Sequence, residues 1–129
     1  MGTAEELAFL LQESGTALVD AGDVLQAVDT ALANKSRFLP KGMTEADAWM
    51  ARNGNPLAST EAAMQVAYLA GKILFIKMKV DAEKGRSIVI VGYAVEDGLI
   101  HGDGDAETLP IAICAAVLDA LDKKGKTNV

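Results

Sequence analysis

The chain has 129 residues, half of them hydrophobic and 23% charged, and its formal net charge is −6. A chain of this length forms one domain and buries about two thirds of its unfolded surface, so its core needs no disulfide or metal. The acidic balance excludes ordinary binding to bare nucleic acid, because phosphate contacts need Lys and Arg. No apolar run approaches the about 20 residues that span a bilayer, so no membrane partner is expected.

Cysteine usage indicates a reducing compartment. Cys114 is the only cysteine, which excludes an internal disulfide and favours a cytoplasmic location. Its thiol lies within the apolar run IAICAAVL, where burial makes it inert rather than nucleophilic. The opening residues, MGTAEELAFLLQ, lack the basic start of a secretory signal or transit peptide.

Four helices are expected in the first 71 residues. Thr3 to Glu6 forms a capping box that starts a helix reaching about Gln12. Apolar residues at helical spacing predict a second helix over 23–33. Capping residues predict a third over 44–52 and a fourth over 59–71, whose small apolar residues favour close packing against a sheet. Pro40 makes the intervening KSRFLPKG a loop.

The next residues predict a β-hairpin. KILFIKMKV alternates between two faces, one carrying Leu74, Ile76, Met78 and Val80 and the other Ile73, Phe75, Lys77 and Lys79. After the turn DAEKG, the β-branched run RSIVIVGYA predicts a second, antiparallel strand. Because this run is apolar at successive positions, both its faces should be covered.

The last third begins with a polar segment and ends in a helix. We expect a loop over 96–107 that encloses at most a short strand at Leu99 and Ile100. Gly102 and Gly104 permit a tight turn there, and Asp105 or Thr108 can cap the next helix. That helix, over about 108–123 with Pro110 in its first turn, is apolar all round and should be central.

The order of these elements predicts an α+β protein. We expect a single domain over 1–129, in which residues 56–124 form a helix–β-hairpin–helix α/β sandwich, residues 1–55 form an N-terminal helical extension, and residues 125–129 form a basic tail. The extension carries more apolar stripes than two strands can cover, so a homo-oligomer is expected.

The acidic segment also contains the only histidine. Asp97, His101, Asp103 and Asp105 are weak metal candidates, because DGD resembles the spacing of calcium loops. The full twelve-residue loop is absent, however, and His101 lacks the Cys or His companions of a zinc site. We therefore expect no metal and a helix entry beside a solvated loop. No P-loop, G-x-G-x-x-G or H-E-x-x-H motif is present, so no cofactor and no catalytic residue are predicted, although a serine paired with His101 remains open.

Two stretches resemble one protein family. ETLPIAICAAVLDAL closely resembles the proline-led "LAIC-x-AAL-x-AL" closing helix of the phage ABA sandwich domain family. PLASTEAAMQVAY is similar to that family's earlier "Y-S-T-x-x-x-A-x-x-V" helix. The resemblance covers about residues 56–124, and the matching positions are Ser59, Thr60, Ala63, Val66, Pro110, Ala112, Ile113, Cys114, Ala116 and Leu118. It implies a two-layer or three-layer α/β sandwich of bacteriophage or prophage origin and supplies no catalytic residues. Ala58 and Ala115 depart from the pattern, since they stand where the family often has Tyr and Arg.

Two functions follow from these patterns. The first is a non-enzymatic phage counter-defence protein that binds and sequesters a nucleotide-type ligand. Such a ligand needs cations and an aromatic ring, which two regions offer: Lys35, Arg37, Phe38 and Lys41 in the loop, and Lys77, Lys79 and Arg86 on the hairpin. The alternative is an inhibitor or adaptor of a host or phage protein, with an interface of Asp20, Asp23, Asp29 and an exposed Trp49. A solvated linker, charged edge protection of the hairpin, and a Trp49 packed over the sheet are the ordinary structural alternatives.

Overall fold

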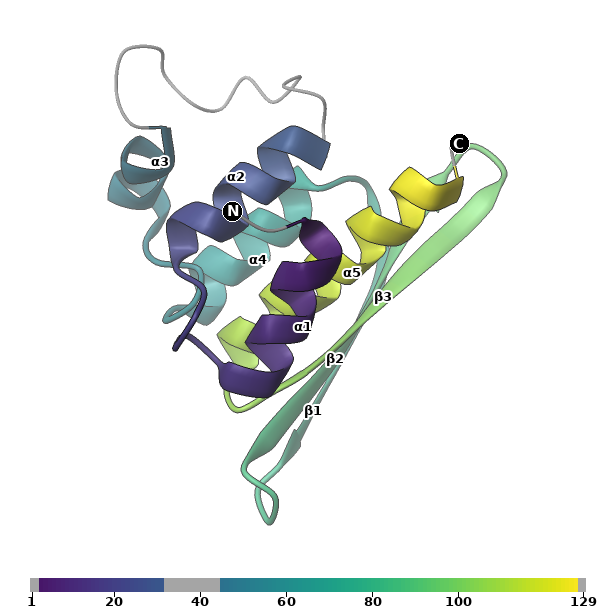
Figure 1. Cartoon of the computed structure of the whole chain (residues 1–129). Helices are drawn as coiled ribbons and strands as arrows, with labels where there is room; N and C mark the ends of the chain where they lie inside the picture. Colours follow the sequence, from purple (N-terminus) through teal and green to yellow (C-terminus); the bar gives the residue numbers. More distant parts are fainter. Residues whose placement is uncertain (1–2, 32–44, 128–129) are drawn as a thin grey trace.

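A computed structural model describes residues 3–31 and 45–127 (Figure 1). This part of the chain is α+β, as predicted, with five helices and a three-stranded antiparallel sheet. The elements are α1 (Ala4–Ser14), α2 (Ala21–Ala31), α3 (Glu45–Asn53), α4 (Thr60–Leu69), β1 (Ile73–Asp81), β2 (Arg86–Val95), β3 (Gly98–Ala106) and α5 (Leu109–Thr127).

The helix starts follow from their capping residues. Thr3 Oγ1 accepts the Glu6 N–H at 3.2 Å before α1, and Ser59 Oγ accepts the Ala62 N–H at 3.2 Å before α4. α2 begins two residues earlier than predicted, because Asp20 and Asp23 cap it reciprocally. Asp20 Oδ1 accepts the Asp23 N–H at 2.9 Å, and the Asp20 N–H donates to Asp23 Oδ2 at 3.1 Å.

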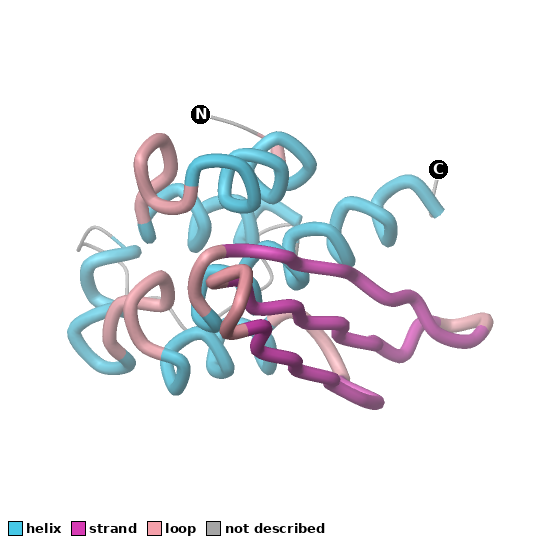
Figure 2. Tube along the Cα trace, turned by 90° about the horizontal axis from the view of Figure 1, so that it is seen from below, coloured by secondary structure: helices cyan, strands magenta, loops and turns pink. Residues whose placement is uncertain are grey.

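The sheet has the order β1-β2-β3, with neighbouring strands antiparallel, and its strands run side by side in Figure 2. The β1–β2 hairpin is confirmed. The loop predicted over 96–107 is wrong, because Gly98–Ala106 forms β3. Gly102 and Gly104 make no turn; they lie within β3 opposite Val91 and Val89. A Cβ atom at Gly102 would overlap the backbone of Ala116 in α5. These glycines therefore serve close strand–helix contact.

One irregularity changes the face of a single residue. A bulge lies between Ile73 and Phe75 in β1. Phe75 and Lys77 lie opposite Gly92 and Ile90, on the face that alternation predicts. Ile73 instead lies opposite Tyr93 and packs against the core. Its predicted place beside Phe75 is wrong, because the extra residue of a bulge shifts the alternation by one position.

All the described helices lie on one face of the sheet (Figure 1). α5 rests on β2 and β3, and α1, α2 and α4 pack around it. The residues of α5 from Ile111 to Leu118 are buried, which confirms the predicted central helix. α4 packs mainly against α5 rather than against the sheet, so its small residues serve helix–helix contact. The other face of β2 has no described helix over it, contrary to the prediction that both faces are covered.

The N-terminal helices belong to the same core as the sandwich. Leu7 and Leu11 of α1 and Val24, Leu25 and Val28 of α2 are buried in one hydrophobic cluster with α5 and the sheet. Their apolar stripes are thus covered within the chain. The prediction of a homo-oligomer from uncovered helical stripes therefore loses its basis.

Candidate functional site

The two predicted cationic regions are not brought together. Lys35, Arg37, Phe38 and Lys41 lie outside the described residues. On the hairpin, Lys77 and Lys79 are exposed on the outer face of β1. Arg86 is engaged elsewhere: its Nε donates to Asp105 Oδ1 at 2.9 Å, and its Nη2 donates to the carbonyls of Asp105 at 2.7 Å and Gln12 at 2.9 Å. Arg86 therefore ties the sheet to α1.

The predicted protein interface loses its anchor. Trp49 is only 2% exposed, so an exposed Trp49 is wrong. It lies in α3, which packs against α2 and α4. The alternative prediction, a Trp49 packed over the sheet, is therefore wrong as well. Asp20 and Asp23 are used in capping α2, and Asp29 is half-buried farther along that helix. The acidic residues of α2 therefore remain, but Trp49 is not an exposed anchor for a partner.

The weak metal candidates are spread along β3 and its preceding turn. His101, Asp103 and Asp105 are exposed on the outer face of the strand, and Asp97 lies in the β2–β3 turn. Within the described residues, no group of three His, Cys, Asp or Glu side chains is placed to hold a metal ion. Asp105 instead binds Arg86, and Asp103 Oδ2 lies 4.0 Å from Lys123 Nζ.

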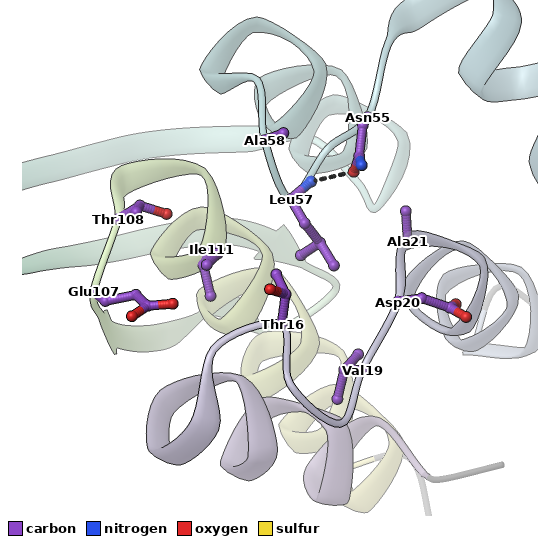
Figure 3. A pocket seen from close by; sticks show the side chains of 10 residues that line it. All are labelled: Thr16, Val19, Asp20, Ala21, Asn55, Leu57, Ala58, Glu107, Thr108 and Ile111. Carbon is purple, nitrogen blue, oxygen red and sulfur yellow. Dashed lines mark hydrogen bonds between the residues drawn. The ribbon is translucent and has the colours of Figure 1, made fainter.

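A cavity of about 420 Å³ lies beside the start of α5 (Figure 3). Three connections form it: the α1–α2 loop, the α3–α4 loop and the β3–α5 loop. Its lining residues are Thr16, Val19, Asp20, Ala21, Asn55, Leu57, Ala58, Glu107, Thr108 and Ile111. Asn55 Oδ1 accepts the Leu57 N–H at 2.9 Å, which holds the α3–α4 loop in place. The volume is that of an ordinary small-molecule pocket.

The lining combines an apolar floor with one directed carboxylate. Leu57 and Ile111 provide apolar surface, and the exposed Glu107 side chain lies over Gly15 with its carboxylate towards Thr16 (Figure 3). Asp20 turns away towards α2, where it caps the helix. Within the described residues, the Glu107 carboxylate forms no hydrogen bond or ion pair, and no Lys or Arg lines the cavity. This lining attracts an N–H donor or a cation and repels a phosphate.

Sequence reasoning missed this cavity. Its residues come from three segments that are far apart in the chain. Thr108 was considered as a helix cap, Asp20 as part of an acidic interface and Ala58 as a departure from the family pattern, and none of them as part of a cavity. The sequence feature that could have indicated a cavity is the change from polar to apolar residues at Pro110, because it places loop residues over the first turn of a buried helix. A second hollow, of about 210 Å³ beside Trp49 and Gln65, is smaller than ordinary ligand pockets.

Two buried ionisable groups, the Tyr93 hydroxyl and the Cys114 thiol, stay protonated and unreactive. The Tyr93 hydroxyl donates to the Ala67 carbonyl at 2.7 Å, and burial, with a smaller effect of nearby Cys114, raises its pKa. Burial also raises the pKa of the Cys114 thiol to about 12, and the thiol donates to the Pro56 carbonyl at 3.4 Å. Both groups stay protonated at neutral pH, so the burial predicted for Cys114 is confirmed and its thiol is not a nucleophile.

Comparison of the chain with models of protein families, with curated proteins and with solved structures found no match. The resemblance to the phage ABA sandwich domain family therefore stays a prediction. The two departures from its pattern lie in different surroundings: Ala58 is exposed and lines the cavity, whereas Ala115 is completely buried in α5. In the described part of the chain, no helix has the length and apolarity needed to cross a bilayer.

Proposed function

We propose that this chain is a non-catalytic binding protein that holds a small molecule in the cavity beside α5. The ligand has an apolar ring or chain and an amino group. The observation that carries the proposal is that the Glu107 carboxylate lines the same cavity as the apolar side chains of Leu57 and Ile111 (Figure 3). A hydrogen bond from an amino group to a carboxylate is among the strong ones in proteins.

Amino-substituted nucleobases have this chemistry, since a carboxylate accepts hydrogen bonds from their exocyclic amino groups. A nucleotide-type ligand is therefore compatible with the cavity if the base enters and the phosphate stays outside. The resemblance of residues 56–124 to a phage family supports a phage accessory role in a bacterial cytoplasm. Sequestering a small signal of host defence would then be the biological use of the site.

Ala58 lies at an exposed part of the cavity lining. The family that the sequence resembles often has Tyr at this position, and the Ala58 side chain lines the cavity. A tyrosine ring there would occupy space that the methyl group leaves free. The substitution Ala58→Tyr is therefore a steric block at an exposed position, and it should leave the core unchanged.

The first experiment is a thermal-shift screen with matched probes. Adenosine and inosine differ in an amino group against a carbonyl, and adenosine and AMP differ in the phosphate. Simple aromatic and aliphatic amines complete the panel. A ligand at about one hundred times its dissociation constant adds about 2.7 kcal/mol to the native state, which raises the melting temperature by several degrees.

Variants then test where the probe binds. Glu107→Gln should weaken binding by roughly tenfold or more, because a neutral amide replaces the charged acceptor. Ala58→Tyr should abolish binding, and Glu83→Gln, in the distant hairpin turn, should leave it unchanged. The proposal is wrong if no probe with an amino group shifts the melting temperature, or if a shift survives both Glu107→Gln and Ala58→Tyr. A shift with AMP but not adenosine would direct attention to residues 35–41.

A further inference from the structure

The outer face of the sheet has no described helix over it (Figure 1). It consists of the residues of β1, β2 and β3 that point away from α5, and we name it the open face. Its middle strand contributes Ile88 and Ile90, both half-buried, and Leu99 of β3 is 52% exposed. β-branched residues on both faces of a strand are typical of sheets covered on both sides.

The register of the sheet orders the charges on this face. Lys79, Ile88 and Asp105 lie side by side across the three strands. The next row is Lys77, Ile90 and Asp103. Each row thus runs from a basic residue on β1 through isoleucine on β2 to an acidic residue on β3. The charges follow from the strand pairing and not from the order of the sequence.

This pattern is complementary to itself. A two-fold axis parallel to β2, lying above the open face, turns a second copy over and reverses every row. Lys77 then faces Asp103 of the second copy, Lys79 faces Asp105, and each isoleucine faces its own equivalent. Two sheets packed face to face lie about 10 Å apart with strands nearly aligned, a gap that a lysine and an aspartate reaching from opposite sides can close.

The acidic partners have room for this contact. Asp105 already binds Arg86, and Asp103 lies near Lys123, but their side chains remain 52% and 56% exposed. Lys77 and Lys79 are exposed too, and Lys77 Nζ lies 5.7 Å from the centre of the Phe75 ring on the same face. Both charged rows are therefore accessible to a second molecule.

We propose that two copies of this chain associate through their open faces, with lysines 77 and 79 of each copy paired with aspartates 103 and 105 of the other. The occupant of the open face is a second copy, because the surface carries both halves of its own charge pattern. This proposal is independent of the cavity and its ligand. It explains why β2 has isoleucine on the face that none of the described helices covers.

The size of the face predicts a weak dimer. Three strands about 4.8 Å apart and nine residues long cover about 14 Å by 30 Å, or roughly 400 Å² for each copy in projection. Two copies then bury about 800 Å² in total, which is below the standard size of specific interfaces and in the range of weak, transient ones. The dimer should therefore dissociate in the micromolar range and weaken with salt, because its charge pairs are only partly buried.

Charge reversal at one row gives a decisive test by sedimentation velocity over a series of concentrations. Lys77→Glu and Asp103→Lys should each weaken the dimer by roughly tenfold to a hundredfold, since like charges then face each other twice. An equal mixture of the two variants should regain the dimer, because each chain supplies the charge that the other lacks. Lys84→Glu makes the same charge change in the β1–β2 turn and should have no effect.

Ile90→Thr provides a second test that keeps a β-branched residue and should also weaken the dimer. Melting temperatures of the separate variants show whether each chain is folded. The proposal is overturned if the wild-type chain stays monomeric at every concentration. It is also overturned if a dimer persists in both charge variants, as pairing through the edge of β1 would predict, or if the mixture of folded variants does not associate.

Discussion

The two faces of β3 use the same short sequence in opposite ways. In residues 102–106, GDGDA, the residues facing α5 are Gly102, Gly104 and Ala106, all buried, while Asp103 and Asp105 face outward and are exposed. On the inner face, even a Cβ atom at Gly102 or Gly104 would overlap the backbone of α5. The outer face has room for charges. The effect of a larger side chain on the stability of this sheet should therefore depend on which face the residue occupies. Substitutions on the two faces test this.

The largest effect is expected on the inner face. Gly104→Ala would place a Cβ atom against the Ala112 carbonyl of α5, a backbone contact that cannot move without shifting the helix. We expect the free energy of unfolding to fall by about 3 kcal/mol, measured by urea denaturation. Gly125→Ala is the matched control, because its Cβ atom meets open space in the last turns of α5. It should stabilise the protein by about 0.5–1 kcal/mol. Equal effects would contradict close packing of β3 on α5.

A smaller loss of stability is expected from removing Arg86, which links the sheet to α1 by hydrogen bonds. Arg86→Ala removes three hydrogen bonds, two to Asp105 and one to the Gln12 carbonyl. The loss should be about 2 kcal/mol, below the sum of three charged hydrogen bonds because the side chain is partly exposed. Lys84→Ala, in the exposed turn, should change stability by less than about 0.5 kcal/mol. Denaturation curves that coincide for these two variants would show that Arg86 does not link the sheet to α1.

The smallest effect is expected for the pH dependence of the free energy of unfolding, which comes from two groups buried between the sheet and the helices. Burial raises the pKa values of Tyr93 and Cys114 in the folded state. Both groups are neutral when protonated, so above the ordinary thiol pKa the unfolded chain loses protons that the folded chain keeps. Stability is therefore full below about pH 8 and declines by roughly 1–2 kcal/mol up to about pH 10. Cys114→Ala should make this decline shallower in thermal melts, and an unchanged slope would mean that the thiol does not contribute.

Local signals in the sequence predicted most helices and the first hairpin. Thr3 and Ser59 cap helices where their side chains indicate, and the alternation of KILFIKMKV gives the faces of Phe75 and Lys77 correctly. Ile73 is on the other face because of a bulge, which depends on pairing with β2 and leaves no mark in the sequence of β1. Capping residues and alternation thus predict an element correctly unless packing against a neighbouring strand or helix alters its backbone.

β3 was missed because glycine and aspartate are both uncommon in strands. Gly102 and Gly104 become acceptable there only because α5 approaches their backbone. The alternation of glycine with aspartate was the available signal, since it repeats with the period of a strand. The cavity could not be predicted from any one segment, because Thr16, Leu57 and Glu107 belong to three different loops. These loops lie together only where they pack at the start of α5. Trp49 was misplaced because helical spacing does not say which neighbours cover a tryptophan.

The position of α5 in the chain has a consequence for how the protein is made. A ribosome synthesises every other described element before Leu109, yet α1, α2, α4 and two strands all pack against α5. Until that helix emerges, the apolar sides of Leu11, Val28 and Val91 have no common partner to bury them. Folding of these elements should therefore wait until α5 has been synthesised, and a nascent chain stalled before residue 109 should be a substrate for chaperones and proteases.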